Sequence, residues 1–132
     1  MQMDFLNAIK DRVPEYAKDI RLNPGGVVAR SSLAPDDAVA AALAAALADD
    51  EDLKTARPEL RMNAYAGDGG VAKAKFEAYA LAASIVGKCH FCVQLHHALL
   101  KKEGGTTQQL RDIGRIAAVV NAAAQALHAE AA

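Results

Sequence analysis

Alanine is the feature that most constrains this chain, because it supplies 31 of the 132 residues, while tryptophan is absent. Alanine has the highest helix propensity of all residues, so the composition predicts an all-α fold. Small side chains let helices approach closely but bury little apolar area. We therefore expect one domain with a thin core, and a tendency to form oligomers that hide more surface.

Charge and hydropathy exclude several classes of protein. The net charge is −1, and 52% of the residues are hydrophobic against 23% charged, which argues against disorder. Without a basic excess, we expect no nucleic-acid partner. No apolar run approaches the ~18 residues of a transmembrane helix, so we expect no membrane partner either. The first residues lack the basic and apolar regions of a secretory signal, so a cytoplasmic location is predicted.

Helix ends are marked by local signals. Pro35 suits a first helical position and begins a predicted helix over 35–48. Further helices are predicted over 71–86, with an apolar stripe and Gly87 as the stop, and over 89–102. Thr106 and Gln109 have the spacing of a capping box at the start of the last helix. The stripe on the helix over 71–86 consists of Phe76, Tyr79, Ala80 and Ala83.

Breaks between these helices are also predicted. Residues 23–26, Asn-Pro-Gly-Gly, read as a turn. The acidic residues 49–52 mark a boundary, because carboxylates are unfavourable at a helix C-terminus. The apolar spacing over 53–65 is irregular, and 67–70 reads as a loop.

The chemically informative residues lie between 77 and 97. At about 100° per helical residue, Cys92 lies about 60° from Cys89 and His96 about 40° from Cys92. These three side chains therefore share one helix face, whereas His97 falls about 140° from Cys92. Glu77, on the preceding helix, is a carboxylate on an otherwise apolar face, and a buried carboxylate needs a partner.

A cysteine pair in the first turn of a helix favours redox chemistry. Unpaired amides and the helix dipole stabilise a thiolate there, and the pair can close into a disulfide and open again. A histidine one turn later can exchange the thiol proton, and Glu77 could orient that histidine. Position at the helix terminus favours Cys89 as the thiolate, whereas proximity to His96 favours Cys92, so these residues leave the nucleophile open.

The spacing of these residues bears on other chemistries. The two cysteines could be packed, inert thiols. A zinc site could use Cys89, Cys92, His96 and Glu77, although structural zinc sites prefer a second separated Cys/His pair. Covalent haem attachment requires a histidine where Val93 stands, and a thioredoxin fold requires strands. A small zinc-binding or structural helical module and a general disulfide reductase therefore remain alternatives for these residues.

The order Glu77, Cys89-x-x-Cys92, His96 within an all-α chain resembles the AhpD-type alkyl hydroperoxidases of the carboxymuconolactone decarboxylase-like superfamily. The likeness extends over most of the chain. Further matching segments are 14–23, 30–32, 60–63, 73–77 and 124–127.

The resemblance implies an antioxidant thiol peroxidase with no bound cofactor or metal. It assigns Cys92 as the peroxidatic cysteine that becomes a sulfenic acid, and Cys89 as the proton donor that resolves it into a Cys89–Cys92 disulfide. Glu77 and His96 would form a proton relay. The implied reductant is the dihydrolipoyl group of a lipoylated acyltransferase, the implied electron acceptor is a partner peroxiredoxin, and the implied assembly is a homotrimer.

Two departures from the family are visible. Some members carry a histidine just before the second cysteine, where this chain has Phe91, with His90 one place earlier. Family chains are also longer, and the gap here falls between Ala48 and Leu53. We therefore expect an AhpD-like bundle that is truncated in its N-terminal half. It would form a single domain over 1–132, with N-terminal helices in 1–52 and a catalytic helical unit in 70–128.

Overall fold

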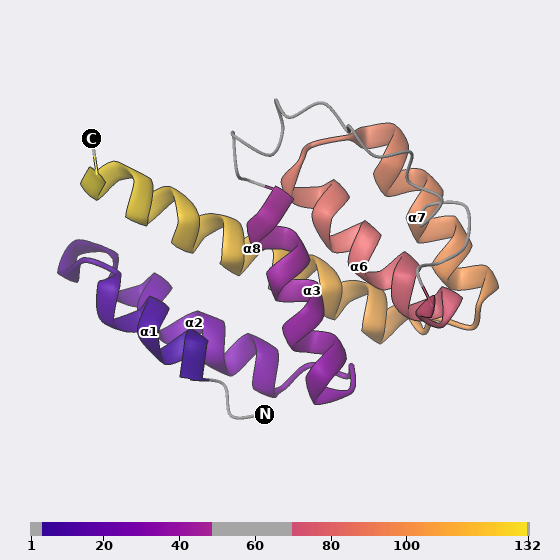
Figure 1. Ribbon diagram of the computed structural model, residues 1–132, viewed down its shortest axis with the longest axis horizontal. Coiled ribbons are helices and arrows are strands. Elements are labelled where there is room, and N and C mark those ends of the chain that lie inside the picture. The colour runs from indigo at the N-terminus through magenta and orange to yellow at the C-terminus, as the bar shows by residue number, and fades with distance from the viewer. Residues whose placement is uncertain (1–3, 49–69, 132) are drawn as a thin grey trace.

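The computed structural model describes residues 4–48 and 70–131, and within these ranges the chain is helical with no strands (Figure 1). The predicted all-α class is therefore confirmed. None of the described helices is both long and apolar enough to cross a bilayer. The elements are, in chain order, α1 (Asp4–Arg12), the 3-10 helix η1 (Glu15–Ala17), α2 (Lys18–Ala29), α3 (Pro35–Ala48), α6 (Lys73–Val86), α7 (His90–Lys102) and α8 (Thr107–Ala131).

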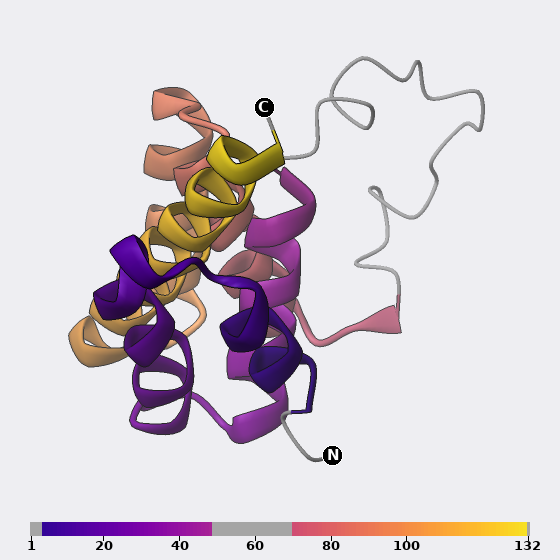
Figure 2. The same ribbon diagram turned by 90° about the vertical axis from the view of Figure 1, so that its left-hand side faces the viewer.

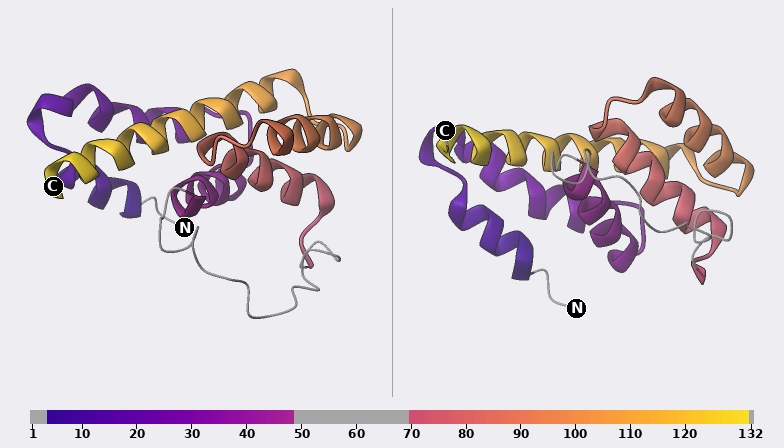
Figure 3. Two further views of the ribbon diagram at one scale, coloured as in Figure 1. Left: turned by 90° about the horizontal axis from the view of Figure 1, so that it is seen from above. Right: turned by 45° about the horizontal axis from the view of Figure 1, so that its top comes forward.

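Helix α8 is the axis of the arrangement. It contacts α2, α3 and α6, and it runs along the length of the molecule (Figures 1 and 3). The N-terminal helices lie beside its C-terminal part, where Val13 and Ala17 pack on Ala126 (Figure 2). At the other end, α6 and α7 form an antiparallel pair, and α7 packs chiefly on α6. The outer side of α7 therefore lies at the edge of the fold.

The core is built on small side chains, as the composition predicts. Helix α3 turns four buried alanines, spaced i, i+3, i+4 and i+7, toward α6 and α8. The larger core residues come from α8, where Ile113 and Ile116 are fully buried, and from Leu81 of α6. The four alanines are Ala38, Ala41, Ala42 and Ala45.

Several predicted helix ends are confirmed. Helix α3 occupies the predicted range, and Gly87 caps the C-terminus of α6. The capping box is complete in both directions: Thr106 Oγ1 accepts the Gln109 amide at 3.1 Å, and Gln109 Oε1 accepts the Thr106 amide at 2.9 Å.

The predicted turn at 23–26 is wrong, because α2 continues through it to Ala29 with Pro24 inside the helix. A proline there removes one helical hydrogen bond, which generally costs about 3 kcal/mol. Two features offset that cost: Pro24 and Val28 are buried on one face of α2, and the Asn23 side chain donates to the Asp19 carbonyl at 2.7 Å. Tertiary burial has therefore overridden the local turn signal.

The stripe that predicted α6, Phe76, Tyr79, Ala80 and Ala83, lies on one side of the helix and is partly buried. The fully buried face is offset by one to two residues, because α6 is enclosed by α3, α7 and α8 and not by a single neighbour. That face consists of Glu77, Ala78, Leu81, Ala82 and Val86. The features predicted within 49–69 lie outside the described residues.

Candidate redox-active site

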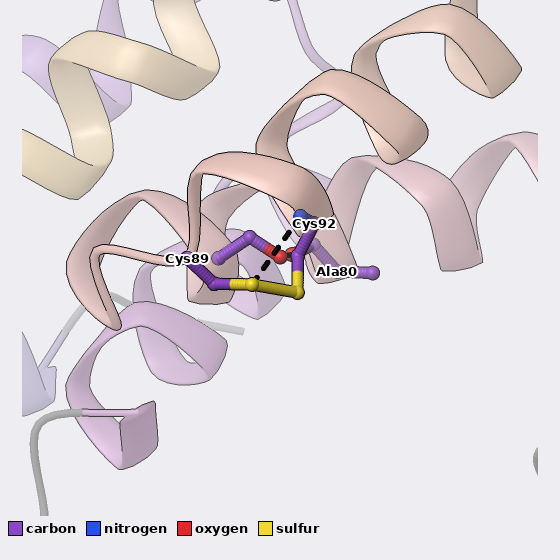
Figure 4. Close-up of a disulfide and its surroundings, with 4 residues drawn as sticks. Ala80, Cys89 and Cys92 are labelled. Atoms are coloured by element: carbon purple, nitrogen blue, oxygen red, sulfur yellow. Dashed lines mark hydrogen bonds between the residues drawn. A yellow bond between two sulfur atoms is a disulfide. The ribbon is translucent and has the colours of Figure 1, made fainter.

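Cys89 and Cys92 are joined by a disulfide at the N-terminus of α7 (Figure 4). Cys89 is the N-cap residue, and its sulfur accepts a hydrogen bond from the Cys92 amide at 3.3 Å. A cap acceptor normally is an oxygen of Ser, Thr, Asp or Asn. Here the sulfur takes that role, so an atom of the redox pair is also the cap of its helix. Both cysteines are partly exposed, which leaves the disulfide open to a reductant.

The turn that presents Cys89 is a Schellman motif at the end of α6. The Cys89 amide donates to the Ser84 carbonyl at 3.2 Å, and the Lys88 amide donates to the Ile85 carbonyl at 3.2 Å. The motif requires a left-handed residue after the cap, and Lys88 fills it with φ 55°. Glycine is preferred there, because a side chain in this conformation costs roughly 1–2 kcal/mol. The connection before the redox pair therefore carries backbone strain.

Glu77 and His96 meet across the interface of α6 and α7. Glu77 Oε2 lies 2.7 Å from His96 Nδ1, with the carboxylate side chain 5% exposed and the imidazole 20% exposed. With the carboxylate ionised, Nδ1 carries the hydrogen and Nε2 becomes the basic nitrogen of the neutral ring. His96 follows Cys92 by four residues, one helical turn along α7. A carboxylate, an imidazole and a cysteine pair are thus arranged along one α6–α7 interface.

The other histidines of the chain lie away from this contact. His90 and His97 are exposed, as the helical spacing predicts for side chains that turn away from Cys92, and His128 is exposed near the end of α8. The structure therefore separates His96, which has a buried carboxylate partner, from its neighbour.

A zinc site is not formed by the predicted ligands. In residues 4–48 and 70–131, no group of three His, Cys, Asp or Glu side chains is arranged to hold a metal ion. The two sulfurs are bonded to each other, whereas zinc binds thiolates. The metal alternative thus finds no support in this geometry.

Helix α6 is braced against α3 by a second polar cluster. The Tyr79 hydroxyl donates to Asp37 Oδ1 at 2.7 Å, and Lys75 Nζ lies 2.9 Å from the same oxygen. Burial and the hydrogen bond to Asp37 raise the pKa of Tyr79 to about 12. Burial acts to raise the pKa of Asp37, but the Tyr79 and Lys75 contacts outweigh it and hold that pKa below its ordinary value. This cluster fixes the helix that carries Glu77.

Sequence reasoning missed Asp112, a buried carboxylate on α8. It accepts the Ser32 amide at 2.8 Å, the Gln108 side chain at 3.1 Å and Arg115 at 3.1 Å. Burial alone would raise its pKa, but the hydrogen bonds, those from Ser32 first, hold it below the ordinary value. The spacing of Gln108, Asp112 and Arg115 on one helix face was a visible signal, whereas the partner 80 residues away was not.

Comparisons with known proteins bear on this site. A model of the carboxymuconolactone decarboxylase family matches residues 51–132. A protein of Rhodospirillum centenum named alkyl hydroperoxide reductase AhpD is 34% identical, over 96% of this chain and 92% of its own. Proteins with the same name from Hyphomonas neptunium and Streptomyces avermitilis are 33% and 31% identical over 96% of this chain. The first alignment runs over 173 positions, more than the 132 residues here, so that relative carries residues that this chain lacks.

Proposed function

The chain belongs to the carboxymuconolactone decarboxylase family, and from this premise we propose that it is an antioxidant thiol peroxidase that reduces alkyl and hydrogen peroxides. The observation that carries the proposal is the 2.7 Å hydrogen bond between Glu77 and His96. His96 lies on α7, the helix that has the Cys89–Cys92 pair at its N-terminus. The name of the relatives, alkyl hydroperoxide reductase, supports the same class of reaction.

The reaction takes two steps at sulfur. The Cys92 thiolate attacks one peroxide oxygen, the O–O bond breaks, and the leaving alkoxide takes a proton to become an alcohol. Cys92 is then a sulfenic acid. The Cys89 thiol attacks the Cys92 sulfur, water leaves, and the disulfide closes. The two thiols lose two electrons and the peroxide gains two, so the disulfide in this structure corresponds to the oxidised end of the cycle.

The proton transfers are assigned to His96 and Glu77. His96 accepts the proton of the attacking thiol, and the buried Glu77 carboxylate holds the ring with Nδ1 protonated. The Glu77 carboxylate, 2.7 Å from Nδ1, fixes the orientation of the ring. Glu77 acts through His96 and is a positioning residue.

The choice of Cys92 as nucleophile rests on the family resemblance and on the place of His96 one turn later. Cys89 has a different advantage, since its sulfur accepts the Cys92 amide at the N-terminus of α7. That contact stabilises negative charge on Cys89, which suits a leaving thiolate when the disulfide is reduced.

The reductant completes the cycle. We assign it to a dihydrolipoyl group on a lipoylated acyltransferase, which gives two electrons to the disulfide and becomes a cyclic disulfide itself. A partner peroxiredoxin would receive electrons by the same exchange. A homotrimer in the cytoplasm is part of the same proposal, and the alanine-built core supports assembly, since it buries little apolar area within one chain.

The test is mass spectrometry of the reduced protein after one equivalent of tert-butyl hydroperoxide. We expect the wild type to lose two thiols per chain and Cys92→Ser to lose all peroxide turnover. Cys89→Ser should react once and trap a sulfenic acid on Cys92 that dimedone labels. Dimedone labelling of Cys89 in Cys92→Ser, with none on Cys92 in Cys89→Ser, would reverse the assignment. A wild type whose thiols survive the peroxide would rule out the peroxidase.

A further inference from the structure

The outer face of α7 carries an apolar stripe beside the redox pair. Phe91, Leu95 and Ala98 are spaced i, i+4 and i+7, so they line one side of the helix. Phe91 is 73% exposed and Leu95 43% exposed. The stripe begins at the residue between Cys89 and Cys92, at the end of α7 that holds the disulfide.

Lysine residues lie at both ends of this stripe. Lys102 follows Ala98 by four residues and extends the same side of the helix, and Lys101 lies next to it. Lys88 stands just before the pair, and all three lysines are exposed. Helix α7 contains no carboxylate, and no ion pair joins these lysines to another residue in the described ranges. Glu103, which follows the helix, is 3.5 Å from Lys73 of α6 and partly neutralised.

We propose that this face of α7 docks the protein that reduces the disulfide, and that the docking segment of that protein is acidic with an apolar side chain for Phe91. The inference rests on the proposed function, because it places the reductant of that cycle. A reductant must bring a thiolate in line with the Cys89–Cys92 bond, so its contacts fall on the surface beside the pair. An exposed apolar stripe that begins at an aromatic residue, with a lysine just before it and two lysines at its far end, is the arrangement that an apolar, negatively charged segment would complement.

A second copy of this chain is a poorer occupant. In a two-fold contact the same surface meets itself, so Lys102 would face the lysines of the other copy, and the three-fold contact proposed above, which joins two different surfaces, would need an acidic surface on the neighbouring copy. Like charges across an interface are unfavourable, and nothing on α7 offsets them. Charge complementarity therefore favours a different, acidic protein.

The experiment compares two synthetic peptides of equal length, each with a Cys-x-x-Cys dithiol and a phenylalanine. One has flanking aspartates and the other flanking lysines. The rate at which each reduces the Cys89–Cys92 disulfide is measured by acid quench and mass spectrometry, with dithiothreitol as a reductant that needs no docking. We expect the acidic peptide to react at least about tenfold faster at low salt, and the advantage to shrink as salt screens the charges.

Matched variants place the effect on α7. Lys102→Glu should remove most of the acidic peptide's advantage, whereas Lys18→Glu, the same charge change at an exposed lysine of α2, should not. Phe91→Ser should slow the acidic peptide several-fold, whereas Leu22→Ser, at an equally exposed residue of α2, should leave it unchanged. All four variants should react with dithiothreitol as the wild type does.

Three outcomes would overturn the docking surface. The first is equal rates for the two peptides, and the second is equal effects of Lys102→Glu and Lys18→Glu. The third is a Phe91→Ser protein that sediments as a smaller species with unchanged peptide rates, which would make the stripe a contact between copies. The proposed function is checked separately by peroxide turnover with dithiothreitol: turnover supports the peroxidase whatever the peptides show, and its absence refutes the peroxidase alone.

Discussion

Two regions of the molecule bury a carboxylate, and they use it differently. In the α6–α7 region, Glu77 has one hydrogen-bond partner among the described residues, the titratable ring of His96. In the seam between α8 and the residues after α2, Asp112 has three partners, none of which releases a proton in the physiological range. The first arrangement leaves a proton able to move, whereas the second fixes the chain in place.

The backbone follows the same division. The α6–α7 connection holds the left-handed Lys88 and presents an exposed aromatic residue, Phe91. The α8 seam is packed by fully buried Ile113 and Ile116. Backbone strain and exposed apolar side chains therefore occur in the α6–α7 region, where chemistry is proposed. Fully buried and hydrogen-bonded side chains occur in the α8 seam, where they stabilise the fold.

Among the residues around the two buried carboxylates, the largest effect is expected at His96. His96→Gln should lower peroxide turnover near neutral pH by about 10²–10⁴-fold, the usual contribution of a general base. It should also raise the pH at which Cys92 is alkylated, because the thiol loses its proton acceptor. The measurement is the pH profile of Cys92 alkylation together with turnover.

His97→Gln is the matched control, since it removes an adjacent but exposed imidazole. It should change turnover by a few-fold at most. Equal losses in the two variants would mean that Glu77 does not single out His96, and the contrast between the two carboxylates would fail.

The next largest effect is expected on stability at Asp112. Asp112→Ala leaves the Ser32 amide and the Gln108 side chain without their acceptor, so we expect a loss of about 2–3 kcal/mol in the free energy of unfolding. Peroxide turnover per folded molecule should not change. Urea unfolding and turnover, measured on the same samples, separate the two.

Acid unfolding gives the control for Asp112. Its pKa in the folded protein lies below the ordinary value, so its stabilisation is full above the unfolded pKa, about 3.9, and is lost as pH falls through the folded pKa. Asp112→Asn has no such titration and should lose less stability than the wild type between about pH 4 and pH 2. If the free energy of unfolding falls equally with pH in the wild type and in Asp112→Asn, Asp112 is not held ionised by its neighbours.

The smallest effect is expected at Lys88. Lys88→Gly removes the left-handed strain of roughly 1–2 kcal/mol and adds unfolded-state freedom of about 0.4–1 kcal/mol, so the protein should gain about 0.5–1 kcal/mol. Lys88→Ala keeps the strain and should show no such gain. A Gly variant that is less stable than the wild type would mean that the lysine side chain makes a stabilising contact that outweighs the strain.

Local chemistry explains which parts of the fold were predictable. The limits of α3, the Gly87 cap and the box of Thr106 and Gln109 depend on residues within one turn of each other, and the sequence predicted them. The approach of Glu77 to His96 was also expected, because the two helices are joined by a short turn that makes them neighbours.

The errors come from residues whose partners are distant. Pro24 stays within α2 because its ring is buried, and no pattern around residues 23–26 reports that. Nothing near Asp112 in the sequence indicates that Ser32, 80 residues away, donates a hydrogen bond to its carboxylate. The left-handed conformation falls on Lys88 and not on Gly87, although glycine is the residue that local sequence favours there. Tertiary contacts decide these positions, and one sequence does not contain them.

The contact between Asp112 and Ser32 also bears on folding kinetics. It joins residues 80 positions apart, and closing a loop of that length costs on the order of 4 kcal/mol of chain entropy. We expect such a contact to form after the neighbouring helices α6, α7 and α8 have associated, and to be largely absent from the transition state. A late contact slows unfolding without hastening folding. The lifetime of the native protein, more than the speed of its formation, therefore depends on this carboxylate.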